Sequence, residues 1–234
     1  MKPTLSNVLS VNGGYVDTAG FLALHGLFTT HVTGNFVTLG AALVLGTSGA
    51  VTKLLALPMF CIMVIATRLL SLALANTKLP VLRTVLAFNV ALLLAGGLLA
   101  VYLGPFNNGD GLPALVTGMT LVSAMAIQNA IHRIHMSASP PSTIMTGSTT
   151  QIMIDVADLL RGASGEARKA IRSRLARLSS SVASFAIGCA AAALLYALQG
   201  IWCFAVPPLI GACAVFMREA RSPTALPTLP PRAL

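Results

Sequence analysis

The strongest constraint on this fold is a series of apolar runs, separated by short turns rich in glycine, proline and asparagine. The longer runs reach the about 17–25 residues that a helix needs to cross a bilayer core. Only 9% of the 234 residues are charged, whereas a soluble domain carries about a quarter. The regular alternation in short segments that is typical of membrane barrels does not occur. The sequence therefore predicts an all-α fold, a polytopic transmembrane helical bundle.

The apolar runs predict six to eight membrane segments within a single transmembrane domain over residues 1–217. Their expected ranges are 11–29, 32–45, 54–75, 81–103, 112–134, 144–160, 181–198 and 201–217. The segments at 32–45 and 144–160 are short for a full crossing. Eight crossings, and six crossings with two re-entrant segments, therefore both stay open. The proline-rich stretch 218–234 is predicted to be a disordered cytoplasmic tail.

Two helix breaks of similar composition indicate an internal repeat. The sequence His-Val-Thr-Gly-Asn occupies residues 31–35, and Ile-Met-Thr-Gly-Ser occupies residues 144–148. Each break follows a helix with polar side chains, Asp17 in the half at about 11–103 and Gln128 with Asn129 in the half at about 112–217. Four segments per half would give repeats of the same orientation, and three would give inverted repeats. Both arrangements occur in secondary transporters, whose sites lie at the repeat interface near broken helices.

The first break belongs to a longer motif, and a second motif follows in the other half. The second consists of Gln128-Asn129-Ala130 followed by Met145-Thr146-Gly147. The first is formed by Gly14, Tyr15, Asp17, Phe21, Leu24, His31, Thr33, Gly34, Asn35, Val37, Leu39 and Gly40. Together they resemble the YoaK family of bacterial integral membrane proteins, catalogued as domain of unknown function 1275. The resemblance covers about residues 10–217 and implies a multi-pass protein of the bacterial inner membrane. It supplies no established substrate or catalytic residue.

Basic residues dominate the charge and predict the orientation. The net charge is +9, and six of the 15 basic residues fall in the stretch 161–177. Ile171, Leu175 and Leu178 lie on one helical face of this stretch, so we expect an amphipathic insert at the cytoplasmic interface in contact with anionic lipid. We therefore attribute the excess of basic residues to contact with anionic lipid and not to nucleic-acid binding. With eight crossings, Lys78, Arg83 and Arg133 would lie outside, against the positive-inside rule.

Polar side chains within the apolar segments are the first candidates for function, because burying a charge in a membrane is costly. Asp17 is interpreted as a proton or cation site, as a counter-ion to Arg68, or as a structural hydrogen-bonding group. Histidine has an ordinary pKa close to neutral pH, so His31 is a candidate for coupling a gate to protons. Gln151 and Asp155 share one helical face with Asp158, which suits cation or proton binding unless the carboxylates merely reach the interface.

The two Thr-Gly breaks are candidates for a second reason. Non-helical backbone inside a membrane needs polar partners or a water-filled cavity, and a helix N-terminus there favours an anionic group. A plain turn at the membrane surface is the competing interpretation. The predicted substrate- or ion-binding residues are Asp17, His31, Thr33, Gly34, Asn35, Gln128, Asn129, Thr146, Gly147, Gln151 and Asp155.

These features predict a transporter or permease for an unidentified small solute, with coupling to protons or cations through Asp17 or Asp155. A membrane interaction or regulatory protein without a transport path is the alternative. No HExxH or GxSxG motif occurs, so we expect no enzymatic activity and no cofactor. His132 and His135 have no neighbouring carboxylate or cysteine in the sequence, and the four cysteines lack CxxC spacing, so no metal site is expected.

Overall fold

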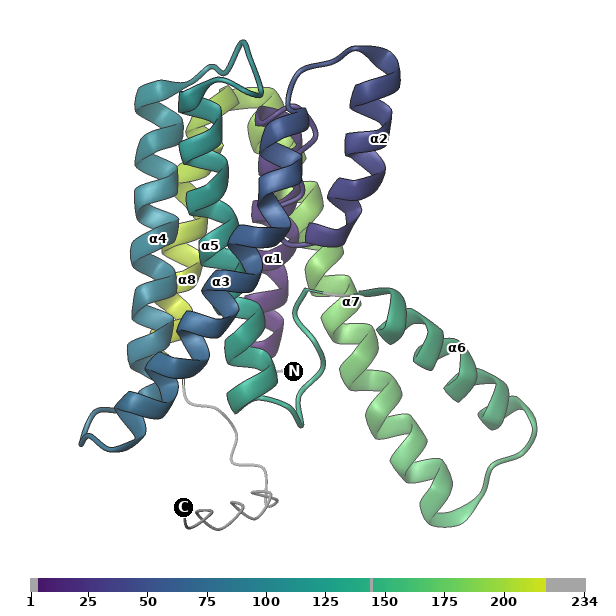
Figure 1. Ribbon diagram of the computed structural model, residues 1–234. Helices are drawn as coiled ribbons and strands as arrows, with labels where there is room; N and C mark the ends of the chain where they lie inside the picture. Colours follow the sequence, from purple (N-terminus) through teal and green to yellow (C-terminus); the bar gives the residue numbers. More distant parts are fainter. Residues whose placement is uncertain (1–3, 144, 218–234) are drawn as a thin grey trace, which may run out of the picture.

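The structure is a computed structural model that describes residues 4–143 and 145–217, and all regular structure within these residues is helical (Figure 1). In chain order the elements are α1 (Leu5–Ala23), the 3-10 turn η1 (Val32–Gly34), α2 (Asn35–Leu45), α3 (Ala50–Ala75), α4 (Val81–Leu103), α5 (Leu112–His135), α6 (Met145–Leu160), α7 (Gly165–Gln199), η2 (Gly200–Ala205) and α8 (Val206–Phe216). The tail predicted at 218–234 lies outside the described residues.

The first helix differs from its predicted range of 11–29. It begins at Leu5 because the Thr4 side chain accepts a hydrogen bond from the Asn7 backbone N–H and caps the helix. It ends at Ala23 because His25 and Gly26 adopt positive φ, which a right-handed helix does not accommodate. Residues 24–31 therefore form a connection, where the hydrophobicity pattern predicted continued helix.

The basic stretch at 161–177 is not the separate interfacial helix that we expected. It forms the first half of α7, which runs without interruption from Gly165 to Gln199. No proline occurs within those 35 residues, and nothing else in the sequence breaks the helix between its basic and apolar halves. Pro207 and Pro208 likewise do not kink a helix, because they occupy the first turn of α8, where no intrahelical N–H is needed.

Helix α5 lies at the centre of the bundle. Of its most apolar stretch 78% is buried, against 17% for α3 and 39% for α4. Helices α3 and α4 pack against it, α8 packs on α4, and α1 packs mainly against α7. Asn12 of α1 donates to the buried Gln128 side chain of α5 over 3.1 Å, which joins the two packing units. The outer helices expose many large apolar side chains.

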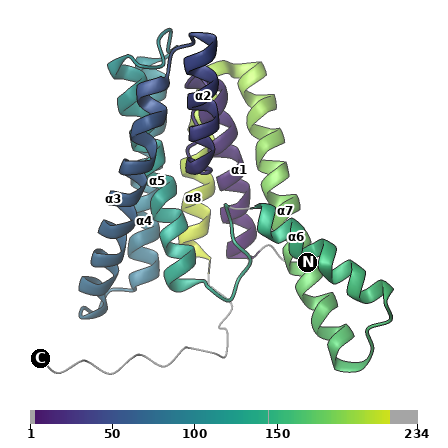
Figure 2. The same ribbon diagram turned by 45° about the vertical axis from the view of Figure 1, so that its right-hand side comes forward.

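Two segments fold back on themselves at opposite ends of the bundle (Figure 1). We call the end with the turns at 46–49 and 104–111 the upper end, and the end with the turns at 76–80 and 161–164 the lower end. From the top of α1, residues 24–34 descend to the middle of the bundle and α2 returns upward. From the bottom of α5, residues 136–143 rise to the middle and α6 returns outward and downward, as Figure 2 shows from a second side. We call residues 24–45 the first arm and residues 136–160 the second arm.

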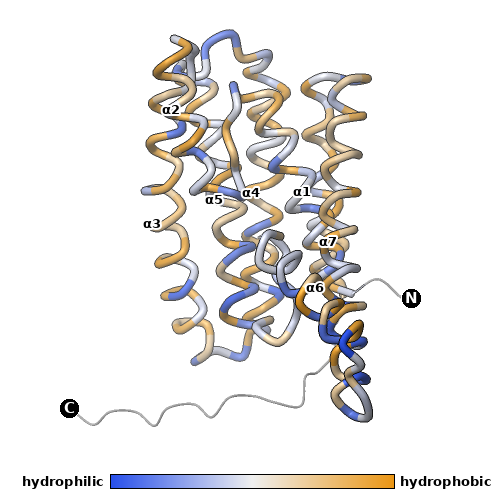
Figure 3. The backbone as a smooth tube through the Cα atoms, turned by 90° about the vertical axis from the view of Figure 1, so that its right-hand side faces the viewer, coloured by the Kyte–Doolittle hydropathy of each residue, from blue (hydrophilic) through white to orange (hydrophobic). Residues whose placement is uncertain are grey.

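The surface indicates a helical membrane protein. Four segments are long and apolar enough to cross a membrane, Ala50–Ala75, Val81–Leu103, Leu112–His135 and Gly165–Phe216. Hydrophilic residues gather on the lower part of α7 and on α6, which project together from the bundle (Figure 3). We call α6 and residues 165–178 of α7 the basic hairpin.

Asp110 ties the upper loops together by capping α3. Its carboxylate accepts the backbone N–H groups of Gly49 and Val51, each over 2.8 Å, and that of Thr52 over 3.3 Å. Burial raises the pKa of this carboxyl, but the N–H donors of residues 49–52 outweigh it and hold the pKa below its usual range. A lowered folded pKa stabilises the fold above about pH 4, the unfolded value, and this contribution is lost as the pH falls through the folded pKa.

We therefore expect Asp110→Asn to destabilise the protein at pH 7 by about 0.3–1 kcal/mol, because the amide oxygen can still accept an N–H but the negative charge at the helix N-terminus is lost. Below both pKa values the variant and the wild type should unfold at the same temperature, because the wild-type carboxyl is then neutral. Thermal unfolding in detergent over a series of falling pH values from pH 7 measures both effects. The exposed Asp158, substituted by asparagine, is the control, and an equal loss in both variants at pH 7 would contradict the capping role.

Candidate functional site

The tip of the first arm is held by Asp17, whose side chain is buried among α1, α7 and the arm. Asp17 is 4% exposed. It accepts the Thr30 backbone N–H over 2.7 Å, and the Nδ1–H of His31 donates to its other oxygen over 2.6 Å. The Thr29 hydroxyl adds a longer contact of 3.4 Å. The partner of Asp17 is therefore His31, and not Arg68, which is exposed on α3.

Asn35 closes the first arm into a compact loop. Its side-chain oxygen accepts the Phe28 backbone N–H, and its side-chain amide donates to the Phe28 carbonyl, both over 2.8 Å. This pair replaces the backbone hydrogen bonds that the broken helix loses. Gly34 packs against the Phe28 ring, where an added Cβ would lie 3.1 Å from a ring carbon, and Thr33 is exposed. Of the four predicted residues in this break, His31, Gly34 and Asn35 therefore shape the loop.

The tip of the second arm is held by the polar pair on α5. Gln128 is fully buried, and its amide donates to the Leu9 carbonyl over 2.9 Å and to the Ser142 hydroxyl over 3.4 Å. Asn129 accepts a hydrogen bond of 2.6 Å from the Thr143 hydroxyl. In each half of the chain, a polar residue of a long helix therefore holds the tip of the arm that follows it.

Both tips reach the same residue of α1. The Thr30 hydroxyl of the first arm contacts the Gly13 carbonyl at 3.4 Å. The Ser142 carbonyl of the second arm approaches the other side of this glycine so closely that an added Cβ would lie 2.8 Å from it. Glycine is needed here because no side chain fits between the helix and the second tip. The two arms, which enter from opposite ends, therefore meet at Gly13.

The Asp17–His31 pair faces a small cavity between α1, α7 and the first arm. The cavity has a volume of about 330 Å³, and aromatic rings line it beside the polar pair. The Phe185 ring lies edge-on to His31 with 5.6 Å between ring centres. An acid–base pair with apolar walls is an arrangement that can hold a proton or a small solute out of bulk water.

Asp155 lies away from this cavity, in the basic hairpin. It is fully buried and pairs with Arg174 through two bonds of 2.9 and 2.5 Å, while Gln151 donates to it over 2.8 Å. The Arg174 guanidinium lowers the pKa of Asp155 below its usual range, although burial alone would raise it. These contacts fasten α6 to α7. Thr146 and Gly147 are exposed in the first turn of α6.

Some residues near the arms were not predicted as site residues. Arg174 lies across the turn at 161–164 from Asp155, and an antiparallel hairpin register would have paired them. Ser148 and Arg133 line a second cavity, and no sequence motif distinguishes them. His132 and His135 belong to no cluster of three metal-binding side chains within residues 4–143 and 145–217.

Fold and site together define a helical membrane protein with two half-length helices whose N-terminal ends lie near the middle of the bundle. The chain belongs to the family described as protein of unknown function (DUF1275), whose model matches residues 5–217. No curated protein and no solved structure matches the chain. The family assignment agrees with the resemblance of the Thr-Gly motifs.

Proposed function

We propose that this protein is a transporter or permease for a small solute, coupled to protons or cations through Asp17 and His31. The observation that supports this most is the meeting of two arms from opposite ends at Gly13. Secondary transporters use such interrupted helices at mid-membrane, where helix termini and freed backbone groups bind solutes. The proposed site includes the arm residues Thr33, Gly34, Asn35, Thr146 and Gly147 with Gln128 and Asn129. Gln151 and Asp155 are assigned to the support of α6.

We further propose six crossings arranged as an inverted repeat. One half would comprise α1, the first arm, α3 and α4, and the other α5, the second arm, α7 and α8. Corresponding helices of the two halves run in opposite directions in Figure 1. With three crossings per half, a pseudo-two-fold axis in the membrane plane relates the halves, as in several transporter folds.

The distribution of basic residues favours six crossings over eight. With two re-entrant arms, Lys78 and Arg133 fall at the lower end together with Arg83 and the stretch 161–177. Lys53 falls at the upper end, where it is buried and donates to the His25 carbonyl over 2.7 Å. By the positive-inside rule, we propose that the lower end of the bundle faces the cytoplasm and that the protein lies in a bacterial inner membrane. Both ends of the bundle domain would then be on the cytoplasmic side. Anionic lipid is the proposed partner of residues 161–177.

A non-transporting interaction or regulatory protein is the second candidate function. The projecting basic hairpin supports it, because within residues 4–143 and 145–217 helix α6 packs extensively against α7 and against no other helix. In addition, Asp17 and Gln151 line two different cavities. A transporter must therefore join or alternately open these spaces. The proposal assigns no enzymatic role, cofactor, metal or nucleic acid to either candidate.

Flux into proteoliposomes tests the transporter proposal. Vesicles with internal pyranine would report proton movement when members of a panel of amino acids, sugars, organic acids and inorganic ions are added. We expect at least one solute to move protons in the wild type, and Asp17→Asn to reduce this flux at least tenfold. Asp158→Asn, the same change at an exposed site, should leave the flux unchanged.

Two results would count against the proposal. If no solute of the panel moves in the wild type, by pyranine or by radiolabel uptake, the interaction protein becomes the better hypothesis. If solute moves but Asp17→Asn and wild type carry equal proton flux, transport stands and its coupling through Asp17 is wrong. His31→Gln separates the two partners of the pair in the same assay.

A further inference from the structure

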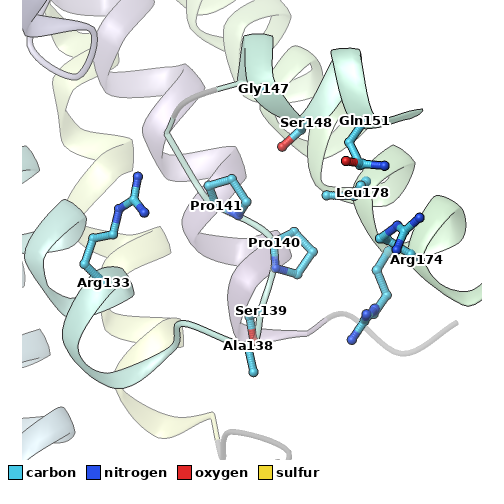
Figure 4. Close-up of a pocket in the computed structure, with 11 residues that line it drawn as sticks. Arg133, Ala138, Ser139, Pro140, Pro141, Gly147, Ser148, Gln151, Arg174 and Leu178 are labelled. Atoms are coloured by element: carbon cyan, nitrogen blue, oxygen red, sulfur yellow. The ribbon is translucent and has the colours of Figure 1, made fainter. Parts of the chain in front are cut away.

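A second cavity lies where the second arm leaves the bundle. It has a volume of about 370 Å³ and is formed by the connection at 138–141, the first turns of α6 and the lower half of α7. Figure 4 shows side chains from α5, α6 and α7 arranged around this space. It shares no lining residue with the Asp17–His31 cavity.

Arginine side chains give this cavity an excess of positive charge. Arg133, Arg174 and Arg177 line it. Arg174 is paired with Asp155, and both oxygens of that carboxylate are occupied by Arg174 and Gln151. Arg133 and Arg177 form no salt bridge with any acidic residue among the described residues. Two guanidinium groups are therefore left for an oxyanion, whose planar or tetrahedral oxygens match the guanidinium fork.

Ser148 supplies a separate indication of a ligand. It is 3% exposed, and its hydroxyl oxygen has no hydrogen-bond partner within residues 4–143 and 145–217. Figure 4 shows this hydroxyl directed toward the cavity from the first turn of α6. A buried hydroxyl without a partner is costly, and an oxygen acceptor in the cavity would satisfy it. The first backbone N–H groups of the 16-residue helix α6, which have no partner within the helix itself, lie at the same place.

We propose that this cavity is a binding site for an oxyanion, held by Arg133, Arg177, the Ser148 hydroxyl and the N-terminus of α6. The shared chemistry is a phosphate or carboxylate group, supplied either by a small soluble anion or by the headgroup of an anionic lipid. The unmatched guanidinium groups disfavour a cation. The site is narrower than the basic surface at 161–177, and it requires no transport activity.

Binding measurements on the purified full-length protein test the site. The first experiment titrates inorganic phosphate into protein in nanodiscs of zwitterionic phosphatidylcholine and follows binding by equilibrium dialysis of radiolabelled phosphate. The second experiment uses native mass spectrometry to measure the phosphatidylglycerol that the protein retains from mixed nanodiscs. We expect saturable binding in at least one of the two experiments. Arg177→Gln and Arg133→Gln should each weaken it about tenfold or more, as for lost charge-assisted hydrogen bonds.

Two further variants distinguish a built site from a charged surface. Ser148→Ala should weaken binding about threefold to tenfold, because only a ligand inside the cavity uses the buried hydroxyl. Arg172→Gln removes an equal charge from an exposed position of α7 that does not line the cavity, so it should change binding less than twofold.

Weaker phosphate binding by the cavity variants identifies the ligand as a soluble anion, and weaker retention of phosphatidylglycerol identifies it as a lipid headgroup. The proposal is overturned if neither ligand binds, if Ser148→Ala binds like wild type, or if Arg172→Gln and Arg177→Gln weaken binding equally. None of these outcomes depends on flux, so the transporter proposal is judged separately.

Discussion

Replacing Gly188 by alanine is expected to destabilise the protein strongly, because the added methyl group would collide with the backbone of a neighbouring helix. A Cβ at Gly188 would collide with the Val11 carbonyl of α1 and lie 3.0 Å from the Tyr15 backbone nitrogen. Neither backbone atom can move aside without separating α1 from α7. Overpacking usually costs about 1–3 kcal/mol, and here we expect the upper end or more. For a chain of this size that lowers the unfolding midpoint by roughly 6 °C or more.

Gly40→Ala is the matched control for this variant. Gly40 also lies inside a helix, but an added Cβ there meets no atom within 4 Å. Alanine should therefore leave the midpoint unchanged or raise it slightly, because glycine weakens a helix by about 0.5–1 kcal/mol relative to alanine. Size-exclusion chromatography of heated samples in detergent measures both. Equal midpoints for the two variants would contradict close packing of α1 on α7.

Removing the Asp17 carboxylate is the second change with a large expected effect. Asp17→Ala leaves the Thr30 N–H and the His31 ring without their acceptor in a buried place. Each buried donor that is left without an acceptor costs about 1–3 kcal/mol. The first arm should therefore detach from α1, which lowers the unfolding midpoint and exposes residues 24–34 to proteolysis.

Asp17→Asn separates the structural part of this role from the chemical part. Its side-chain oxygen still accepts the Thr30 N–H, so we expect less than half of the destabilisation seen with alanine. Asp158→Ala, at an exposed position of α6, should leave both the midpoint and the cleavage pattern unchanged. If Asp17→Ala is as stable as Asp158→Ala, the carboxylate does not hold the first arm.

Much of the helical content could be predicted from hydrophobicity alone. The ranges of α4 and α6 follow the apolar pattern closely, because glycine, proline and polar turns end both helices near the predicted bounds. The extent of α1 could not be predicted in this way. Its first turns carry serine and asparagine side chains, which look like a loop until their partners on α7 are known. Ser10 lies 2.9 Å from the Ser181 hydroxyl, and Asn7 donates to Ser180 over 2.9 Å.

The sequence indicates which polar residues need partners within the bundle, but not which partners they take. Asp17, Gln128 and Asn129 are recognisable because polar groups in apolar helices need partners. Which partner each takes depends on how the arms fold back, and segment length alone leaves re-entrant and crossing arrangements equally open. The Asp17–His31 and Asp155–Arg174 pairs therefore follow from tertiary structure. Gly13, where the arms meet, carries no signal beyond being a glycine in a helix.

The side of the membrane on which each turn lies tests the re-entrant arms most directly. In a cysteine-free background, Thr47→Cys and Asn107→Cys report on the upper end, and Lys78→Cys and Glu166→Cys report on the lower end; all four positions are exposed. A membrane-impermeant maleimide applied to intact cells should label positions 47 and 107 alike. Positions 78 and 166 should react only after permeabilisation. Eight full crossings would instead place position 47 with position 166 and position 78 on the opposite side, and labelling in that pattern would contradict two arms that enter from opposite ends and meet at Gly13.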